Sequence, residues 1–405
     1  MSIQTELLSA PKVPLRYLAR FNPRPTAIGS DESCYIPMEA ISEFGAVDTS
    51  RMRPTVELAQ GYSFVADGDV AYAKVTPCFE NGKGLRAAGL PGGHAFATTE
   101  ITVIRPSSQL DHRYLAWILQ SEEFRAVGEA HMTGAGGLKR VPESYAARYR
   151  VPHPSTEVQR AIADYLDRET AQIDAFIAKN EELITLLNER RLVEISRAIS
   201  GDWPEVQLRT LSTVPIQNGV DAIGDPANPQ EWPRYVRTTD IENISSLDPD
   251  KRVTIAPDVA AVSPVVKDDI LLTRAGATIG KSYLHSSGEV ASYAGYLVRV
   301  RPDRQRVLPW YLAYWTQSQE YLDQIRSGAV ISTIENFSAS KYRALRVPLP
   351  TIEVQAEIVD RIRRSSADAY RAMAMATAAI ALARERRAAL ISAAVTGKID
   401  VGVAA

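Results

Sequence analysis

The chain has 405 residues and a mass of 44.4 kDa, which is more than one compact core usually holds, so about two to three domains are expected. Hydrophobic residues make up 45% and charged residues 23%, a composition that is typical of globular proteins and argues against overall disorder. A net charge of −2, from 46 Lys and Arg against 48 Asp and Glu, argues against nucleic-acid binding through bulk charge. A net charge near zero is compatible with local basic patches.

The N-terminal residues 1–12 lack the apolar segment of a secretory signal, and no run of eighteen apolar residues occurs in the chain. The most apolar stretch, residues 372–383, is short and lies between Arg371 and Arg384, which favours a packed helix. Cys34 and Cys78 provide neither a disulfide framework nor a paired metal-binding motif. We therefore expect a cytoplasmic protein with no membrane association and no metal site.

Short apolar runs separated by turn residues predict two β-rich domains of mixed structure. The expected strands are residues 69–75 and 101–104 in the first domain, and residues 270–272 and 296–300 in the second. One amphipathic helix is expected in each domain, followed by a glycine-containing loop. These helices are residues 112–127 and 309–325, and the loops are residues 133–140 and 327–332.

A long helix is predicted after each of these domains. Residues 154–201 recur as residues 350–397 at an offset of 196, and 18 of the 48 aligned positions are identical. Each copy starts with a proline and a Ser or Thr that can cap a helix, and Glu157 or Glu353 follows in the first turn, where negative charge is favourable. A helix of about 45 residues would be on the order of 65 Å long.

Apolar positions along both helices follow the alternating steps of four and three residues that are typical of coiled coils. The first helix carries large residues and the second small ones, which could interdigitate. Because the connections are short, we expect the two helices to pair antiparallel; packing of each helix on its own domain is the alternative. The predicted seam consists of Ile162, Leu166, Ile173, Phe176, Leu183 and Leu187 with Ile358, Ile362, Ala369, Ala372, Ala376, Ala379 and Ala383.

The domains that precede the helices also correspond, although more loosely. Residues 35–41 resemble residues 235–241, and residues 69–74 resemble residues 269–274. The predicted fold is therefore α+β, with two β-rich mixed domains joined and spaced by two long antiparallel helices in a pseudo-two-fold internal repeat. The expected division is a first domain at 1–153, a central helix at 154–201, a second domain at 202–349, and a C-terminal helix and tail at 350–405. One architecture used twice suggests the reading of two different targets.

The best candidate for a catalytic site is the segment from Gly276 to Ser282. It resembles a phosphate-binding loop, but only three residues separate its two glycines, and the residues that follow Lys281 predict a strand where a phosphate loop needs a helix. The five histidines show no ligand spacing. We therefore expect no catalytic residue, no metal and no cofactor in this chain.

Basic and amide side chains gather in the glycine-containing loops of both domains. Arginine can bind guanine through two hydrogen bonds, whereas lysine and backbone amides more often bind phosphates. Ordinary surface charges beside turns are the alternative interpretation. The candidate DNA-binding residues are Lys74, Thr76, Asn81, Lys83, Arg86, Lys139 and Arg140 in the first domain, and Arg234, Arg237, Thr238, Arg274, Thr278, Lys281 and Lys341 in the second.

The chain resembles the specificity subunit of type I restriction-modification systems, the HsdS family. The motifs that carry this resemblance are residues 76–83 (TPCFENGK), the paired helix starts at 154–159 and 350–355, and residues 390–400 (LISAAVTGKID). The resemblance implies a non-catalytic protein with two target-recognition domains, each reading one half of a bipartite asymmetric site on double-stranded DNA. It implies that the helices set the spacer between the half-sites.

The resemblance also implies partners. The helices would dock two modification (methyltransferase) subunits, which bind S-adenosylmethionine, and restriction (motor and nuclease) subunits that use ATP and Mg would join them. A related fused or methylation-only system fits the sequence equally well. Two further alternatives are a nucleotide-binding enzyme built on Gly276 to Ser282, and a coiled-coil scaffold with no role on DNA.

Overall fold

The computed structural model describes residues 2–25, 29–45, 47–135, 137–328 and 336–402. The chain divides into two compact units: Met1–Asn180 with Ala378–Ala405 (unit 1), and Glu181–Thr377 (unit 2). Unit 1 contains the first half of one long helix and the second half of the other, and unit 2 contains the complementary halves.

The two long helices are α6 (Thr156–Ile199) and α11 (Ile352–Val395), each 44 residues long, as predicted. The Ser155 hydroxyl accepts from the backbone N–H of Val158 at 3.5 Å at the start of α6, consistent with a cap. After α11, Gly397 has a φ of 73°, and the N–H of Lys398 donates to the carbonyl of Ala393 at 2.9 Å. This left-handed glycine lets the chain leave the helix with its last carbonyls satisfied.

The predicted seam is observed at most positions but changes register along α6. Phe176 and Leu183 are 48% and 43% exposed, whereas their neighbours Ile177 and Ile184 are half-buried. The shift begins at Thr170, which is 3% exposed and lies four residues after the buried Leu166. A straight helix has 3.6 residues per turn, so its buried stripe drifts away from a strict heptad. The other predicted seam residues are buried or half-buried: Ile162, Leu166, Ile173, Leu187, Ile358, Ile362, Ala369, Ala372, Ala376, Ala379 and Ala383.

Unit 1 contains two four-stranded sheets, one antiparallel in the order β2-β9-β6-β7 and one mixed in the order β4-β3-β8-β5, in which β3 and β8 are parallel. Two ribbons, β1-β12 and β10-β11, accompany them. The strands are β1 (Lys12–Pro14), β2 (Ala19–Phe21), β3 (Glu32–Ile36), β4 (Met52–Pro54), β5 (Ser63–Ala66), β6 (Val70–Ala73), β7 (Gly84–Arg86), β8 (His94–Ala97), β9 (Ile101–Pro106), β10 (Thr133–Ala135), β11 (Leu138–Arg140) and β12 (Arg150–Pro152).

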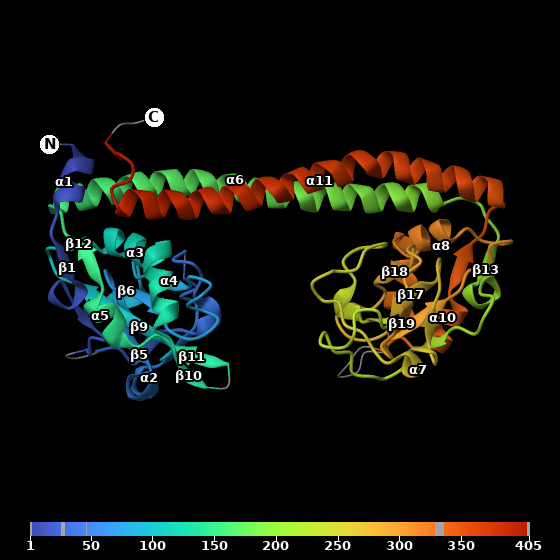
Figure 1. Ribbon diagram of the computed structural model, residues 1–405, viewed down its shortest axis with the longest axis horizontal. Helices are drawn as coiled ribbons and strands as arrows, with labels where there is room; N and C mark the ends of the chain where they lie inside the picture. The colour runs from blue at the N-terminus through green and yellow to red at the C-terminus, as the bar shows by residue number, and fades with distance from the viewer. Residues whose placement is uncertain (1, 26–28, 46, 136, 329–335, 403–405) are drawn as a thin grey trace. The chain divides into compact units, whose positions relative to one another are not determined.

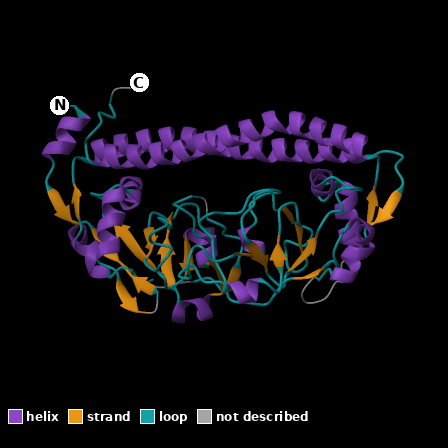
Figure 2. Cartoon of the chain, turned by 45° about the vertical axis from the view of Figure 1, so that its right-hand side comes forward, coloured by secondary structure: helices purple, strands orange, loops and turns teal. Residues whose placement is uncertain are grey.

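Unit 2 repeats this topology. Its antiparallel sheet has the order β14-β20-β17-β18, its mixed sheet has the order β15-β19-β16 with β15 and β19 parallel, and its ribbon is β13-β21. The strands are β13 (Glu205–Gln207), β14 (Gln217–Asn218), β15 (Arg234–Val236), β16 (Pro264–Val265), β17 (Ile270–Thr273), β18 (Ser282–Leu284), β19 (Ala291–Tyr293), β20 (Leu297–Val300) and β21 (Arg346–Pro348). In both units, loops and turns link these short strands (Figure 2).

The predicted helices at 112–127 and 309–325 are each broken into two. In unit 1 they are α3 (His112–Gln120) and α4 (Glu122–Ala130); in unit 2 they are α8 (Pro309–Trp315) and α9 (Gln319–Gly328). A buried serine makes each break: the hydroxyl of Ser121 accepts from the N–H of Phe124, and that of Ser318 from the N–H of Tyr321. A serine that caps the next helix competes with continuation of the previous one. The remaining helices are α1 (Ile3–Ser9), α2 (Thr55–Gly61), α5 (Glu143–Arg148), α7 (Pro257–Ala260) and α10 (Ala339–Ala344).

Each unit is held to its long helices by equivalent buried groups. The side chain of Gln159 on α6 accepts from the N–H of Asp111 at 2.8 Å, and that of Gln355 on α11 accepts from the N–H of Leu308 at 2.8 Å. Both glutamines are fully buried. α3 in unit 1 and α8 in unit 2 lie between the long helices and the sheet (Figure 1). The same kind of contact therefore attaches each unit to its own part of the long helices.

Candidate nucleic-acid interface

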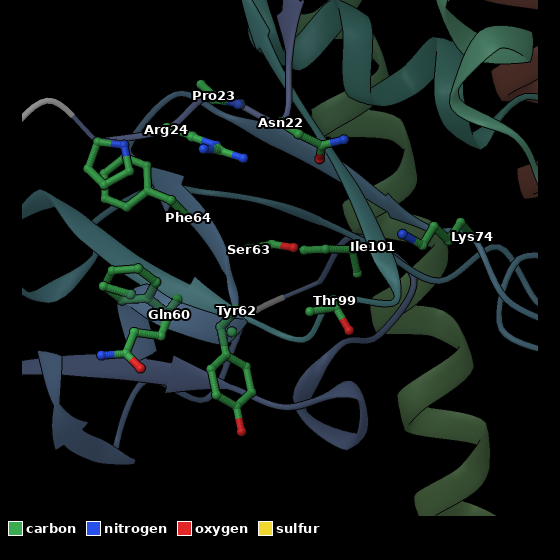
Figure 3. Close-up of a pocket in the computed structure, with 14 residues that line it drawn as sticks. Asn22, Pro23, Arg24, Gln60, Tyr62, Ser63, Phe64, Lys74, Thr99 and Ile101 are labelled. Atoms are coloured by element: carbon green, nitrogen blue, oxygen red, sulfur yellow. The ribbon is translucent and has the colours of Figure 1, made fainter. Parts of the chain in front are cut away.

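A polar hollow of about 560 Å³ lies in unit 1, where the chain leaves β2 and passes from β8 to β9. Its wall includes Arg24 after β2, Gln60 and Tyr62 before β5, Lys74 after β6, and Thr99 before β9. Figure 3 shows these side chains arranged around the hollow. The site therefore combines cations, an amide, a hydroxyl and an aromatic ring, which are the groups that contact phosphates and bases.

The cations of this hollow are available for a ligand. Among the residues that the structure describes, neither Arg24 nor Lys74 forms an ion pair within 4.0 Å. The ring of Tyr62 in this wall is held in place by an edge-on contact with the ring of Tyr35, and the two ring centroids are 4.9 Å apart. Burial and the nearby Tyr62 raise the pKa of the Tyr35 hydroxyl, so this ring stays neutral.

Four of the predicted residues of unit 1 lie together beside this hollow. The N–H of Thr76 donates to the carbonyl of Lys139 at 2.9 Å, which ties the exposed β10-β11 hairpin to the segment after β6. Arg140 donates two hydrogen bonds to Glu100, at 2.7 and 2.8 Å, and the N–H of Lys74 donates to the Glu100 carbonyl at 2.9 Å. The guanidinium of Arg140 lowers the pKa of Glu100, so this carboxylate stays charged and compensates Arg140.

The other predicted residues of unit 1 are placed differently. Asn81 is exposed and Lys83 half-buried on the turn before β7. Arg86 donates to Asp167 of α6 at 3.1 Å, and Asp167 also accepts from the indole N–H of Trp117. The contact of Arg86 with DNA stays a prediction, but its guanidinium is bound to the long helix, a partner that no local pattern indicated.

A second hollow, of about 670 Å³, lies in unit 2 beside the matching connection from β19 to β20, but its other wall comes from β15, whereas that of unit 1 comes from α2 and β5. Its wall includes Ile223, Tyr235, Arg237, Thr238 and Tyr296. The two sites correspond through the backbone: in unit 1 residue 74 donates to the carbonyl of residue 100, and in unit 2 residue 274 donates to the carbonyl of residue 296 at 3.0 Å. The connection between β8 and β9 in unit 1, and between β19 and β20 in unit 2, therefore borders a hollow in both units. The side chains around the two hollows differ.

Several predicted residues of unit 2 are engaged inside the unit. Arg234 is only 7% exposed and donates to the carbonyl of Asp248 at 2.8 Å, so it is corrected to a structural residue. Arg237 forms an ion pair with Asp240 at 2.8 Å but still lines the hollow. The ammonium groups of Lys281 and Lys341 donate to backbone carbonyls at 2.5 and 2.6 Å.

Three predicted residues of unit 2 remain accessible. Arg274 is half-buried and donates to the side-chain oxygen of Asn336 at 3.3 Å, and among the described residues it forms no ion pair. Thr278 is exposed, and Thr238 lines the hollow. The loop predicted at 327–332 falls mainly outside the described residues.

The segment from Gly276 to Ser282 does not have the structure of a phosphate-binding loop. A turn over residues 277–280 leads directly into strand β18, as the sequence predicted. A phosphate site needs the N-terminus of a helix at this point. Lys281 is also turned toward the carbonyl of Ile241. The geometry therefore does not support the nucleotide-binding alternative.

The described part of the chain contains neither a metal-binding cluster nor a membrane-spanning helix. No group of three or more His, Cys, Asp or Glu side chains there is placed to hold a metal ion. No helix there is long and apolar enough to cross a membrane.

Sequence reasoning missed several residues that line the hollows. In unit 1 these are Arg24, Gln60 and Tyr62, and in unit 2 they are Ile223 and Tyr296. Arg24 carried a usable signal, because prolines at 23 and 25 stiffen the segment that displays it. Ile223 and Tyr296 had none, since a lone apolar residue in a loop is common. Gln60 and Tyr62 belong to no motif in the sequence.

The chain is similar to known proteins in sequence and in fold. No protein-family model matches the chain. It is 31% identical over 225 residues to the specificity subunit of the type I restriction enzyme EcoEI from Escherichia coli, and 31% identical over 224 residues to that of EcoAI from the same organism. Each alignment covers 52% of this chain and 37% of the relative, so the chain spans well under half the length of these proteins.

Among solved structures, the fold is similar to a chain described under "complex assembly and conformational transition of the type I R-M system". The TM-score is 0.68 at 14% identity, and the match covers 98% of this chain and 97% of the other. This similarity confirms the predicted α+β fold with two long helices. The resemblance seen in the sequence is thus confirmed: over about half of its length, the chain is similar in sequence to the specificity subunits of type I restriction enzymes.

Proposed function

We propose that this chain is the non-catalytic DNA-recognition subunit of a type I restriction-modification complex. Its first domain, residues 1–153, would read one half of a bipartite asymmetric site on double-stranded DNA, and its second domain, residues 202–349, the other half. One observation carries the proposal: the same connection is hollowed in both units and lined by different side chains. A repeated scaffold with different linings is what the reading of two unrelated half-sites requires.

The two linings differ in the chemistry they offer. Unit 1 presents Arg24, Gln60 and Lys74, which can donate hydrogen bonds to base acceptors and phosphates. Unit 2 presents the apolar Ile223 and the ring of Tyr296 together with Asp221, Arg237 and Thr238. The backbone N–H of Arg274 donates to the carbonyl of Tyr296. A single chain with two different reading surfaces needs no palindrome, unlike a symmetric dimer.

We further propose that the helices at 154–201 and 350–405 set the spacer between half-sites and dock the modification subunits. In unit 1, α6 and α11 form a groove of about 340 Å³ between Ile173, Phe176, Ala379 and Leu382. Phe176 and Leu382 are both exposed there. An apolar groove between two helices fits a helix from a partner protein.

Leu382→Asp is expected to weaken binding of the modification subunit by about 10- to 100-fold, because a charge in an apolar interface must be desolvated. Titration calorimetry with the purified modification subunit measures this loss. Ala381→Asp is the matched control, since Ala381 is exposed on the same helix but does not line the groove. Equal effects of both variants would contradict docking at this groove.

The proposal places all catalysis in partner subunits. S-adenosylmethionine would be bound by two modification subunits, and ATP and Mg by restriction subunits that carry the motor and the nuclease. This division is testable with the assembled complex. The chain is co-expressed with its modification subunit, and methylated adenines are mapped across the host genome. We expect a split motif with a fixed gap; a stable complex that methylates nothing would contradict the proposal.

Arg274→Ala is expected to reduce affinity for the site by about 1–3 kcal/mol and to relax one base position in the half-site of unit 2 only. The reason is that Arg274 donates through its backbone N–H to the carbonyl of Tyr296, which lines the hollow, and that it has no ion-pair partner among the described residues. Binding to duplexes with single substitutions measures the effect. Lys267→Ala, an exposed cation elsewhere in unit 2, is the control. An equal loss on all sequences would identify a phosphate contact.

A further inference from the structure

The hollow of unit 2 displays two large apolar side chains. Ile223 is 94% exposed and Tyr296 is 64% exposed, and both line the same hollow. Single exposed hydrophobic residues are ordinary on protein surfaces. Two of them at one concave site, whose wall also contains Arg237 and Thr238, indicate a surface that a partner covers.

The two loops that carry these residues are held together by close backbone packing. The N–H of Val220 donates to the carbonyl of Tyr293 at 3.0 Å. A Cβ on Gly219 would lie only 2.0 Å from that carbonyl oxygen, so the approach depends on glycine. Behind them, the hydroxyl of Tyr235 donates to Val220 at 2.8 Å and accepts from the N–H of Ala222 at 3.2 Å. The backbone segments that carry the apolar pair are therefore fixed to each other by these contacts.

The equivalent position in unit 1 has different chemistry. There the place of Tyr296 is taken by Glu100, which is bound to Arg140 at the base of the β10-β11 hairpin. Unit 1 thus offers a compensated ion pair where unit 2 offers an aromatic ring. Because the two positions match in the fold but carry different side chains, we expect them to contribute to a difference in base specificity between the two units.

We propose that Ile223 and Tyr296 recognise a thymine in the half-site of unit 2 by packing against its C5 methyl group in the major groove; this rests on the proposed function. The thymine methyl is the apolar group that base edges display in that groove. Arg274, whose backbone N–H donates to the carbonyl of Tyr296, adds positive charge to this part of unit 2, and positive charge attracts the duplex. The two side chains are specificity-determining residues that neither basic patches nor motifs reveal.

The test uses the chain assembled with its modification subunit, and synthetic duplexes that carry the mapped site. Each thymine is replaced in turn by uracil, which keeps every hydrogen-bonding group and removes only the methyl. The wild-type complex should bind one uracil duplex, altered in the unit 2 half-site, about 3- to 10-fold more weakly, the effect of one buried methyl group. Ile223→Ala and Tyr296→Ala should bind the thymine and uracil duplexes equally.

Two further variants sharpen the result. Tyr296→Phe keeps the ring and should keep the preference for thymine. Val262→Ala is the matched control, because Val262 is 66% exposed in the same unit and does not line the hollow. A wild-type complex that binds a bipartite site but ignores every uracil substitution would overturn this inference alone. Alanine variants that keep the full preference would overturn it as well, whereas a wild-type complex that binds no bipartite site would refute the proposed function.

Discussion

Asp269→Ala should lower the free energy of unfolding of unit 2 by about 2–4 kcal/mol. Asp269 is fully buried and accepts from Nε and an Nη of Arg301, both at 2.8 Å, and from the N–H of Val266 at 2.9 Å. Its carboxylate raises the pKa of the Arg301 guanidinium. Removal of one partner of a buried pair leaves the other unsatisfied, which usually costs about 3–5 kcal/mol. The range is set lower here because the Arg301 side chain is 27% exposed and can rehydrate.

Urea unfolding followed by hydrogen exchange measures both the size and the place of this effect. Asp368→Ala is the control, because Asp368 pairs with Arg371 on the exposed surface of α11 and such pairs contribute little. The pair recurs in unit 1 as Asp69 with Arg105, at 2.7 Å. Asp69→Ala should therefore destabilise unit 1 in the same way. Loss of protection spread evenly over both units in each variant would contradict two separately stabilised units.

Insertion of one heptad into both long helices should abolish methylation of the natural site and create methylation at a site whose spacer is about three base pairs longer. Seven residues lengthen a helix by about 10 Å and preserve the phase of the seam. The insertion points are after Asn180 in α6 and after Thr377 in α11, where the two compact units meet along the sequence. Genome-wide mapping of methylated adenines measures the new motif.

The half-sites themselves should be unchanged by this insertion, because neither hollow is touched. Insertion into α6 alone is the control, since it puts the two helices out of register and should give a poorly methylating complex. An unchanged spacer with full activity would contradict the proposal that the helices set the distance between half-sites.

Local patterns were sufficient wherever a structural feature depends on neighbours in sequence. The heptad steps and the capping Ser155 predicted α6 to within about two residues at each end, and the apolar runs predicted the central strands β6, β9, β17 and β20. Prediction failed where one side chain could either lie within a helix or cap the next helix. Ser121 and Ser318 interrupt their helices because each hydroxyl caps the following helix. Both serines are buried, so their hydroxyls bind backbone groups instead of water.

The candidate site was predicted less well for the same kind of reason. Lys74, Thr76, Lys139 and Arg140 were expected on one surface and do lie together, because the loops that carry them pair through their backbones. Arg86 and Arg234 looked equivalent to them in sequence. Their guanidinium groups are directed to Asp167 and to the carbonyl of Asp248, partners 81 and 14 residues away along the chain.

Sequence alone was enough to establish that one architecture is written twice, that a long helix follows each copy, and which family the chain resembles. These properties are periodic or repeated along the chain, so they can be recognised in the linear sequence. Only the tertiary structure decided which cations are compensated, that the equivalent connection is hollowed in both units, and that Ile223 and Tyr296 are exposed there. Those outcomes depend on contacts between distant segments, and on close packing that a glycine permits at a single point.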